Sequence, residues 1–319
     1  MKAIVAAVFA ALVCAAGSAA AENDYPTKPV RLIVPFPPGT AADYVGRLIA
    51  EKWSAAWGQP VVIDNVPGAA GTIGLAKLAK SPPDGYAIAL PGDAATVVNI
   101  SLMANLPYDP RRDLAPIMQV GAPPNLLVVN KDLPAKNVAE LIALARARPG
   151  KLSYASSGIG TSQHLGGEFL ATMAGIDIVH VPYKDSYFSD LISGRVDFAF
   201  ANTVIALPQV QAGAVRALAV SSAKRAAIVP DLPPVGDTVP GFAVTPWFGL
   251  VAPAGTPPAI IAKVHAETAR ALADPELRAK FADRGFEIVG GTTEEFRALI
   301  ASEIPRIATL LQSRGLKPQ

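Results

Sequence analysis

The strongest indication of the fold class is the segment Val30-Arg31-Leu32-Ile33-Val34-Pro35-Phe36-Pro37-Pro38-Gly39-Thr40. It joins a short β-branched run, a Pro- and Gly-rich breaker and a residue type that caps helices. We therefore expect a strand over 30–34, then a helix that is capped by Thr40 or Asp43 and ends near Gly58. A strand that leads through a Gly-containing loop into a helix is typical of α/β sheets.

The same alternation continues along the chain, interrupted by a Pro-rich irregular segment over 230–246. It predicts a parallel or mixed sheet covered by helices on both faces. Further strands are expected at 61–63, 86–90, 125–130, 152–156, 178–182, 196–200, 215–221 and 248–252, and further helices at 69–80, 138–148, 162–174, 260–273, 275–284 and 293–312.

Length and composition limit the class of protein. The 319 residues are too many for one typical domain and suit two. Hydrophobic residues make up 51% and charged residues 17%, which excludes an intrinsically disordered chain. A formal net charge of +2 gives no electrostatic reason to expect a nucleic-acid partner.

The first 21 residues have the layout of a secretory signal peptide: Lys2, an apolar run over 3–16, and small residues at 19–21. A transmembrane anchor is the alternative, but the run is short and Ala-rich. We expect export to the periplasm and a mature chain that starts at Glu22. The single cysteine, Cys14, lies inside the leader and follows Val13, which disfavours lipidation.

Catalytic motifs are scarce. There is no G-x-S-x-G, P-loop or H-E-x-x-H pattern, and Gly158-Ile159-Gly160 lacks the third glycine of a dinucleotide fingerprint because Gln163 stands there. His164 and Glu168 are four residues apart on an expected helix. They form either the acid/base pair of an exported enzyme or a helix-start histidine beside a carboxylate. Two groups are too few for a metal site, so we expect no metal and no cofactor.

Two loops expose backbone N–H groups instead. Residues 37–41 and 156–162 each lie between an expected strand and an expected helix. Glycine lets the backbone approach a ligand closely, and the first N–H groups of a helix favour an anion. Taken alone, each loop is equally well explained as an ordinary connection between a strand and a helix. Facing one cleft, the two loops could hold a carboxylate without Arg or Lys.

Several segments, in order along the mature chain, resemble the periplasmic solute receptors of tripartite tricarboxylate transporters, the Bug or TctC family. They are Tyr25-Pro26-Thr27-Lys28-Pro29 with the stretch quoted above, Gly58-Gln59-Pro60-Val61-Val62-Ile63-Asp64-Asn65, Gly150-Lys151-Leu152-Ser153-Tyr154-Ala155-Ser156-Ser157-Gly158, His180-Val181-Pro182-Tyr183-Lys184, and Phe248-Gly249-Leu250-Val251-Ala252-Pro253.

The resemblance implies a type II periplasmic-binding-protein fold, with two α/β domains joined by two crossing strands and a ligand cleft between them. Domain 1 would hold 22–124 plus 244–319, and domain 2 would hold 125–243. It also implies a monomer that binds a small carboxylate, delivers it to membrane subunits and performs no catalysis. By position, the ligand-binding residues would be Phe36, Gly39, Thr40, Ala41, Asp43, Gly92, Asp93, Ala94, Ser156, Ser157, Gly158, Gly160, Thr161, His164, Asp185 and Asn202.

The sequence departs from the family pattern at three places. Gly39-Thr40 replaces Gly-Gly, Asp93 replaces a neutral polar residue, and the segment 185–189 is shorter and bulkier. Asp93 and Asp185 would repel a plain carboxylate, so a zwitterionic or cationic-headed ligand is an alternative. Amino-acid-like and aromatic acids are therefore included among the expected ligands. A ligand sensor that signals to a membrane kinase is an alternative to the transport role.

Overall fold

Strand β1 (Val30–Val34) lies within a six-stranded sheet that is covered on both faces. The computed structural model describes residues 25–313, so the predicted signal peptide lies outside the described residues. The sheet order is β11-β4-β10-β3-β1-β2. The other strands of this sheet are β2 (Val61–Asn65), β3 (Ala87–Ala89), β4 (Leu114–Ala122), β10 (Phe248–Pro253) and β11 (Glu287–Gly290).

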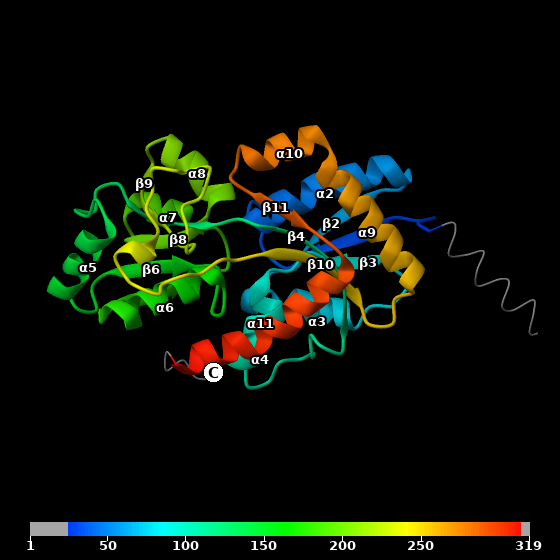
Figure 1. Ribbon diagram of the computed structural model, residues 1–319, viewed down its shortest axis with the longest axis horizontal. Helices are drawn as coiled ribbons and strands as arrows, with labels where there is room; N and C mark the ends of the chain where they lie inside the picture. Colours follow the sequence, from blue (N-terminus) through cyan, green and yellow to red (C-terminus); the bar gives the residue numbers. More distant parts are fainter. Residues whose placement is uncertain (1–24, 314–319) are drawn as a thin grey trace, which may run out of the picture.

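A second, five-stranded sheet has the order β7-β6-β8-β5-β9. Its strands are β5 (Asn125–Asn130), β6 (Ser153–Ser156), β7 (Val179–Pro182), β8 (Phe198–Asn202) and β9 (Val215–Val220). Both sheets are mixed: β1 pairs in parallel with β2 and β3, β6 with β7 and β8, whereas β10 and β5 run antiparallel to their neighbours. The two sheets form two lobes side by side (Figure 1), which confirms the predicted two-domain α/β fold. The exact boundaries at 124/125 and 243/244 stay a prediction.

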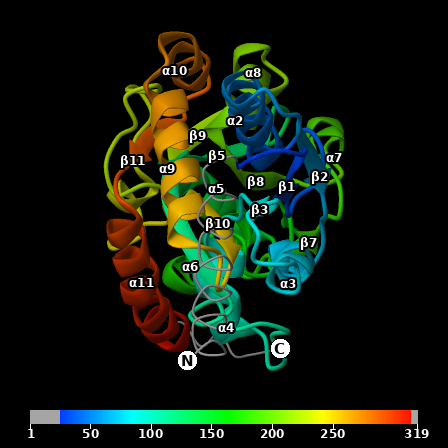
Figure 2. The same cartoon turned by 90° about the vertical axis from the view of Figure 1, so that its right-hand side faces the viewer.

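Alternation along β1 sorts its side chains onto two faces. Leu32 and Val34 belong to the core cluster that contains the buried side chains of α2 and α9, and Ile33 belongs to the cluster that contains those of α3 and α11. Figure 2 shows α2, α9, α3 and α11 arranged around the sheet. The helical segments of this lobe are α2 (Ala41–Trp57), η1 (Ala69–Gly71), α3 (Thr72–Ala79), η2 (Ala94–Val98), α4 (Asn99–Leu102), α9 (Pro258–Ala273), α10 (Pro275–Ala282) and α11 (Thr293–Ser313).

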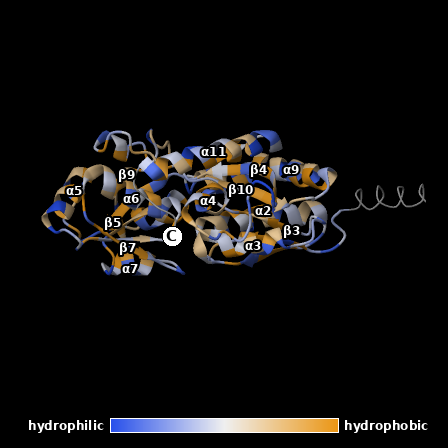
Figure 3. Ribbon diagram, turned by 90° about the horizontal axis from the view of Figure 1, so that it is seen from below, coloured by the Kyte–Doolittle hydropathy of each residue, from blue (hydrophilic) through white to orange (hydrophobic). Residues whose placement is uncertain are grey.

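The second lobe follows the same rule. Leu127 and Val129 of β5 pack with α5 and α6, and Leu126 and Val128 pack with α7 and α8. Hydropathy colouring shows hydrophobic segments running through both lobes (Figure 3). The helical segments are α5 (Val138–Ala147), α6 (Ser162–Ala174), α7 (Phe188–Ser193), α8 (Thr203–Gln211) and η3 (Val235–Asp237). Within residues 25–313, no helix is long and apolar enough to cross a membrane.

The chain crosses between the lobes twice, directly from β4 to β5 and again through the segment that precedes β10. Ser221, which is fully buried, ties the two crossings together. Its backbone N–H donates to the carbonyl of Asn125 at 2.8 Å, and its hydroxyl donates to the carbonyl of Val244 at 2.6 Å. The crossings therefore form one hydrogen-bonded seam.

One predicted helix begins later than expected, and five elements were not predicted: the helical run 94–102, β4, α7, α8 and β11. The helix expected over 69–80 begins at Thr72, because Ala69 (φ 46°) and Ala70 (φ 51°) take left-handed conformations that a helix does not allow. The nine-residue strand β4 was not predicted. It contains Pro116 and Gly121, which weaken the strand pattern in the sequence.

Helix α6 lies unusually close to its sheet. A Cβ added at Gly167 would lie 2.2 Å from the Tyr154 ring of β6, and one at Gly166 would lie 2.7 Å from the Phe200 ring of β8. The Tyr154 ring is fixed between His180 and Phe198, on which it stacks. The absence of side chains at these two positions thus lets the helix approach.

Gly167→Ala is therefore expected to destabilise the protein by about 1–3 kcal/mol through overpacking, although alanine is the better helix former. Thermal unfolding should show a lowered Tm. The control is Thr172→Ala on the exposed face of the same helix, which should change stability by no more than about 0.5 kcal/mol. An unchanged or raised Tm for Gly167→Ala would contradict this account of the packing.

Candidate functional site

A small cavity of about 40 Å³ lies between the lobes, where four helical segments begin. These are α2, the continuous helical run 94–102, α6 and α8. We call it the inner cavity. Asp93 is the one residue with an ionisable side chain among the described residues that line it. The lining residues are Phe36, Thr40, Ala41, Ala42, Gly92, Asp93, Ala94, Ser157, Thr161, Ser162, Gln163, Asn202, Ile205, Pro246 and Phe248.

The first-lobe loop is shaped by a reciprocal cap. Thr40 is the N-cap of α2, and its hydroxyl accepts from the backbone N–H of Asp43. The Asp43 carboxylate accepts in return from the N–H of Gly39 at 2.9 Å, where φ is +79°. Arg47 and Asn65 also donate to Asp43. Burial opposes ionisation, but these hydrogen bonds hold the pKa of Asp43 below its usual range.

The second-lobe loop runs from Ser156 to Thr161, which is the N-cap of α6. Gly158 and Gly160 have φ values of +120° and +88°, so both need glycine. Gly160 also passes close to the other lobe, because a Cβ there would lie 2.3 Å from Oδ1 of Asn99. The loop therefore contacts the first lobe through its backbone.

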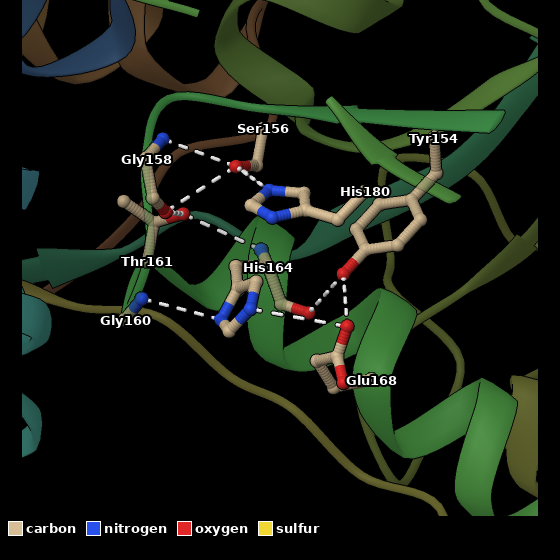
Figure 4. Close-up of polar contacts among 8 residues, drawn as sticks. All are labelled: Tyr154, Ser156, Gly158, Gly160, Thr161, His164, Glu168 and His180. Atoms are coloured by element: carbon tan, nitrogen blue, oxygen red, sulfur yellow. Dashed lines mark hydrogen bonds and ion pairs between the residues drawn. The ribbon is translucent and has the colours of Figure 1, made fainter. Parts of the chain in front are cut away.

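A cluster of polar side chains forms hydrogen bonds with this loop (Figure 4). The ring of His164 accepts the N–H of Gly160 at Nδ1, 3.2 Å away. The ring of His180 shares a 2.6 Å hydrogen bond with the hydroxyl of Ser156, which in turn accepts from the N–H of Gly158. The cluster fixes the loop backbone rather than presenting groups to the inner cavity.

The predicted His164–Glu168 pair belongs to this cluster. Nε2 of His164 is 3.9 Å from Oε1 of Glu168, which already accepts from the Tyr154 hydroxyl at 2.7 Å. Burial lowers the pKa of His164 to about 4, and burial together with the neighbouring His164 lowers that of His180 to about 4. Both rings are neutral at pH 7, and neither lines the inner cavity.

Asp93 has the opposite shift. Burial raises the pKa of its carboxyl to about 7, backbone N–H groups of Ala94 and of Asp93 itself oppose the rise, Glu303 adds to it and Arg306 opposes it. Near neutral pH the group is therefore partly protonated. A protonated carboxyl can donate a hydrogen bond to an anion, whereas an ionised one repels it.

Asn125 connects the crossing seam to the inner cavity. Its fully buried side-chain amide accepts from Nδ2 of Asn202 and donates to the hydroxyl of Ser162 at 3.1 Å. Both partners line the inner cavity. No local sequence pattern distinguishes Asn125, since it is simply the first residue of a buried strand.

A larger space, the outer cavity, adjoins the inner one and shares Phe36 and Ser157 with it. Its volume is about 790 Å³, within the range of about 300–1,000 Å³ that is usual for ligand pockets. Its walls come from both lobes: 35–37, 67–71, Ile73, Asn99, Leu102 and Met103 on one side, and 157–159 and 182–185 on the other.

The sixteen predicted site residues fall into three groups. Nine line the inner cavity, including Phe36 and Ser157, which line both: Phe36, Thr40, Ala41, Gly92, Asp93, Ala94, Ser157, Thr161 and Asn202. Gly158 and the exposed Asp185 line the outer cavity only. The other five line neither cavity and take part in the hydrogen bonds that fix the two loops: Gly39, Asp43, Ser156, Gly160 and His164.

Sequence reasoning missed six inner-cavity residues. Three of them are helix-start neighbours of predicted positions and could have been included on that ground: Ala42, Ser162 and Gln163. The other three lie on α8, on the crossing segment and at the start of β10: Ile205, Pro246 and Phe248. Within residues 25–313, no group of three or more His, Cys, Asp or Glu side chains is placed to hold a metal ion.

Solved structures with similar folds agree with this architecture. R. palustris Rpa4515 with adipate is 36% identical with a TM-score of 0.89, covering 92% of this chain and 100% of that one. The periplasmic binding protein BugD is 34% identical with a TM-score of 0.89 and the same coverage. MatC (Rpa3494) from Rhodopseudomonas palustris with bound malate is 29% identical with a TM-score of 0.86, covering 90% and 100%.

The family model described as "Tripartite tricarboxylate transporter family receptor", TctC, matches residues 45–316. This match spans most of the chain, including the starts of three of the four helical segments at the inner cavity. The chain therefore belongs to the TctC family of periplasmic solute-binding proteins.

Proposed function

We propose that this chain captures a small carboxylate-bearing solute between its two lobes and delivers it to the membrane subunits of a tripartite tricarboxylate transporter. The observation that carries the proposal is the convergence of four helix starts on the inner cavity. Each helix start combines N–H groups that have no partner within the helix with the positive end of a helix dipole. Together they form a receptor for an anion that needs no cationic side chain.

The two-lobe arrangement supports capture by closure. The inner cavity takes its lining from both lobes, with Thr40 to Ala42 on one and Thr161 to Gln163 on the other. A ligand that contacts both stabilises the closed form over any open one, and the closed form is what a membrane partner can recognise. We infer that the protein acts as a monomer in the periplasm after removal of residues 1–21.

The properties of relatives agree with this choice of ligand. Rpa4515 was solved with adipate and MatC with malate, and both are carboxylates. The enzyme alternative lacks comparable support, since the His164–Glu168 pair is turned toward Tyr154 and away from the inner cavity. Cavity, family and relatives thus favour the same role.

A charge placed in the inner cavity tests the site. Asn202→Asp keeps the size of the side chain, adds a negative charge to the lining and removes the amide that donates to Asn125, so we expect carboxylate affinity to fall at least about tenfold. Isothermal titration with adipate, malate and a panel of other mono- and dicarboxylates would measure it on the exported protein. The control is Asn137→Asp, the same change at the exposed N-cap of α5, which should leave affinity unchanged.

Wild-type protein that binds no member of the panel, after unfolding and refolding to remove co-purified ligand, would contradict the proposal. Equal losses in Asn202→Asp and Asn137→Asp would contradict the location of the site. Circular dichroism of both variants separates loss of binding from loss of fold.

The pKa of Asp93 leads to a second prediction. If a carboxylate binds only when Asp93 is protonated, a pKa of about 7 makes the affinity fall about tenfold between pH 6 and pH 8. Asp93→Asn should remove this pH dependence, because the amide donates at every pH. Titrations across this range, on both proteins, would measure it.

An amine-bearing ligand would behave in the opposite way. It should bind more tightly as Asp93 ionises, and Asp93→Asn should weaken it. A pH profile that is flat in wild type and unchanged in Asp93→Asn would place the Asp93 carboxyl away from the ligand.

A further inference from the structure

The outer cavity is lined mainly by apolar side chains. Two of them, Ile73 from the first lobe and Ile159 from the second, are 53% and 40% exposed. Large exposed apolar side chains that share one cavity mark a surface that a ligand covers. Phe36, Leu102 and Met103 add further apolar area to the same cavity.

Two polar side chains of the outer wall already have hydrogen-bond partners within the protein. The amide of Asn99 donates to the carbonyl of Ala69 and to the hydroxyl of Thr72. The hydroxyl of Tyr183 donates to Asp190 at 2.8 Å. Lys184 and Asp185 are the charged residues that line the outer cavity, and both are exposed. Their charges are opposite, so the lining of the outer cavity carries no net charge that would attract a second carboxylate.

The backbone of the first-lobe wall is strained. Ala69 and Ala70 are the non-glycine residues with positive φ within residues 25–313. Such conformations are unfavourable for residues with a Cβ and concentrate at sites where a ligand is clamped. This wall lies close to the opposite loop, since a Cβ at Gly158 would lie 3.4 Å from the backbone nitrogen of Ala70.

We propose that the preferred ligand is a monocarboxylate with an apolar body, its carboxylate in the inner cavity and its alkyl or aromatic part in the outer cavity. This inference rests on the proposed function and gives its substrate class. The two cavities share Phe36 and Ser157, so one molecule can occupy both. The inner cavity has room for little more than one carboxylate group, so the body must extend outward.

Matched probes test the inference. Hexanoate and adipate share a six-carbon chain and differ in the second carboxylate, and 3-phenylpropanoate adds a ring. We expect hexanoate and 3-phenylpropanoate to bind at least about tenfold more tightly than adipate in isothermal titration, because burial of apolar surface favours them and desolvation disfavours a second charge.

Variants locate the apolar body. Ile159→Asn should weaken 3-phenylpropanoate about fivefold or more, because it removes apolar contact in the outer cavity. The control is Val179→Asn, the same kind of change at a 45% exposed side chain of the second lobe that does not line the cavity. It should leave the affinity unchanged.

The outcomes separate this inference from the proposed function. Adipate or malate bound more tightly than hexanoate would overturn the inference and leave the carboxylate receptor intact. Equal effects of Ile159→Asn and Val179→Asn would also overturn it. Absence of binding for every carboxylate would overturn the proposed function itself.

Discussion

The buried amide of Asn125 is the interaction on which the rest of the site depends. It is the first residue of β5, and its backbone carbonyl accepts the N–H of Ser221, which holds the second crossing. Its side chain holds Asn202 and Ser162, one on each of two converging helix starts. An unpaired amide in this position would cost the full desolvation penalty of a buried polar group. Any rotation of the lobes about the crossing seam must therefore carry these two helix starts with it.

The electrostatics of the inner cavity depend on backbone groups and on burial rather than on cationic side chains. Under the proposed function, the inner cavity attracts an anion with backbone dipoles. The cationic side chains of the described residues do not line it, and several of them form exposed ion pairs such as Arg111–Asp109 and Lys77–Asp64. Exposed pairs contribute little to stability and are screened by salt. Fixed dipoles in a buried cavity are screened much less. The pKa of Asp93 is raised because burial outweighs the opposing effect of nearby backbone N–H groups.

Local signals in the sequence predicted the local structure. The β-branched run of β1, the cap at Thr40 and the glycines at 158 and 160 each act within a few residues, and the structure contains all of them. Directions of side chains were not predictable in the same way. Asp43 and His164 stand at the right positions, but each satisfies a backbone N–H of its own loop. A short polar side chain at a helix start serves a cap or a ligand equally well, and only tertiary packing decides between them.

Long-range features were beyond the sequence for a different reason. Ile205, Pro246 and Phe248 reach the inner cavity because two crossings bring distant segments together, and no local pattern encodes that meeting. The contrast between local and long-range features also distinguishes the inner cavity from the outer cavity. The inner cavity is built largely from backbone groups at helix starts, so many sequences with the right caps can form it. The outer cavity is lined by side chains such as Ile73, Met103 and Ile159. Substitution of these residues changes the shape and polarity of the outer cavity directly. Under the proposed function, one way of holding a carboxylate in the inner cavity is compatible with different outer walls, and the outer wall decides what the carboxylate is attached to.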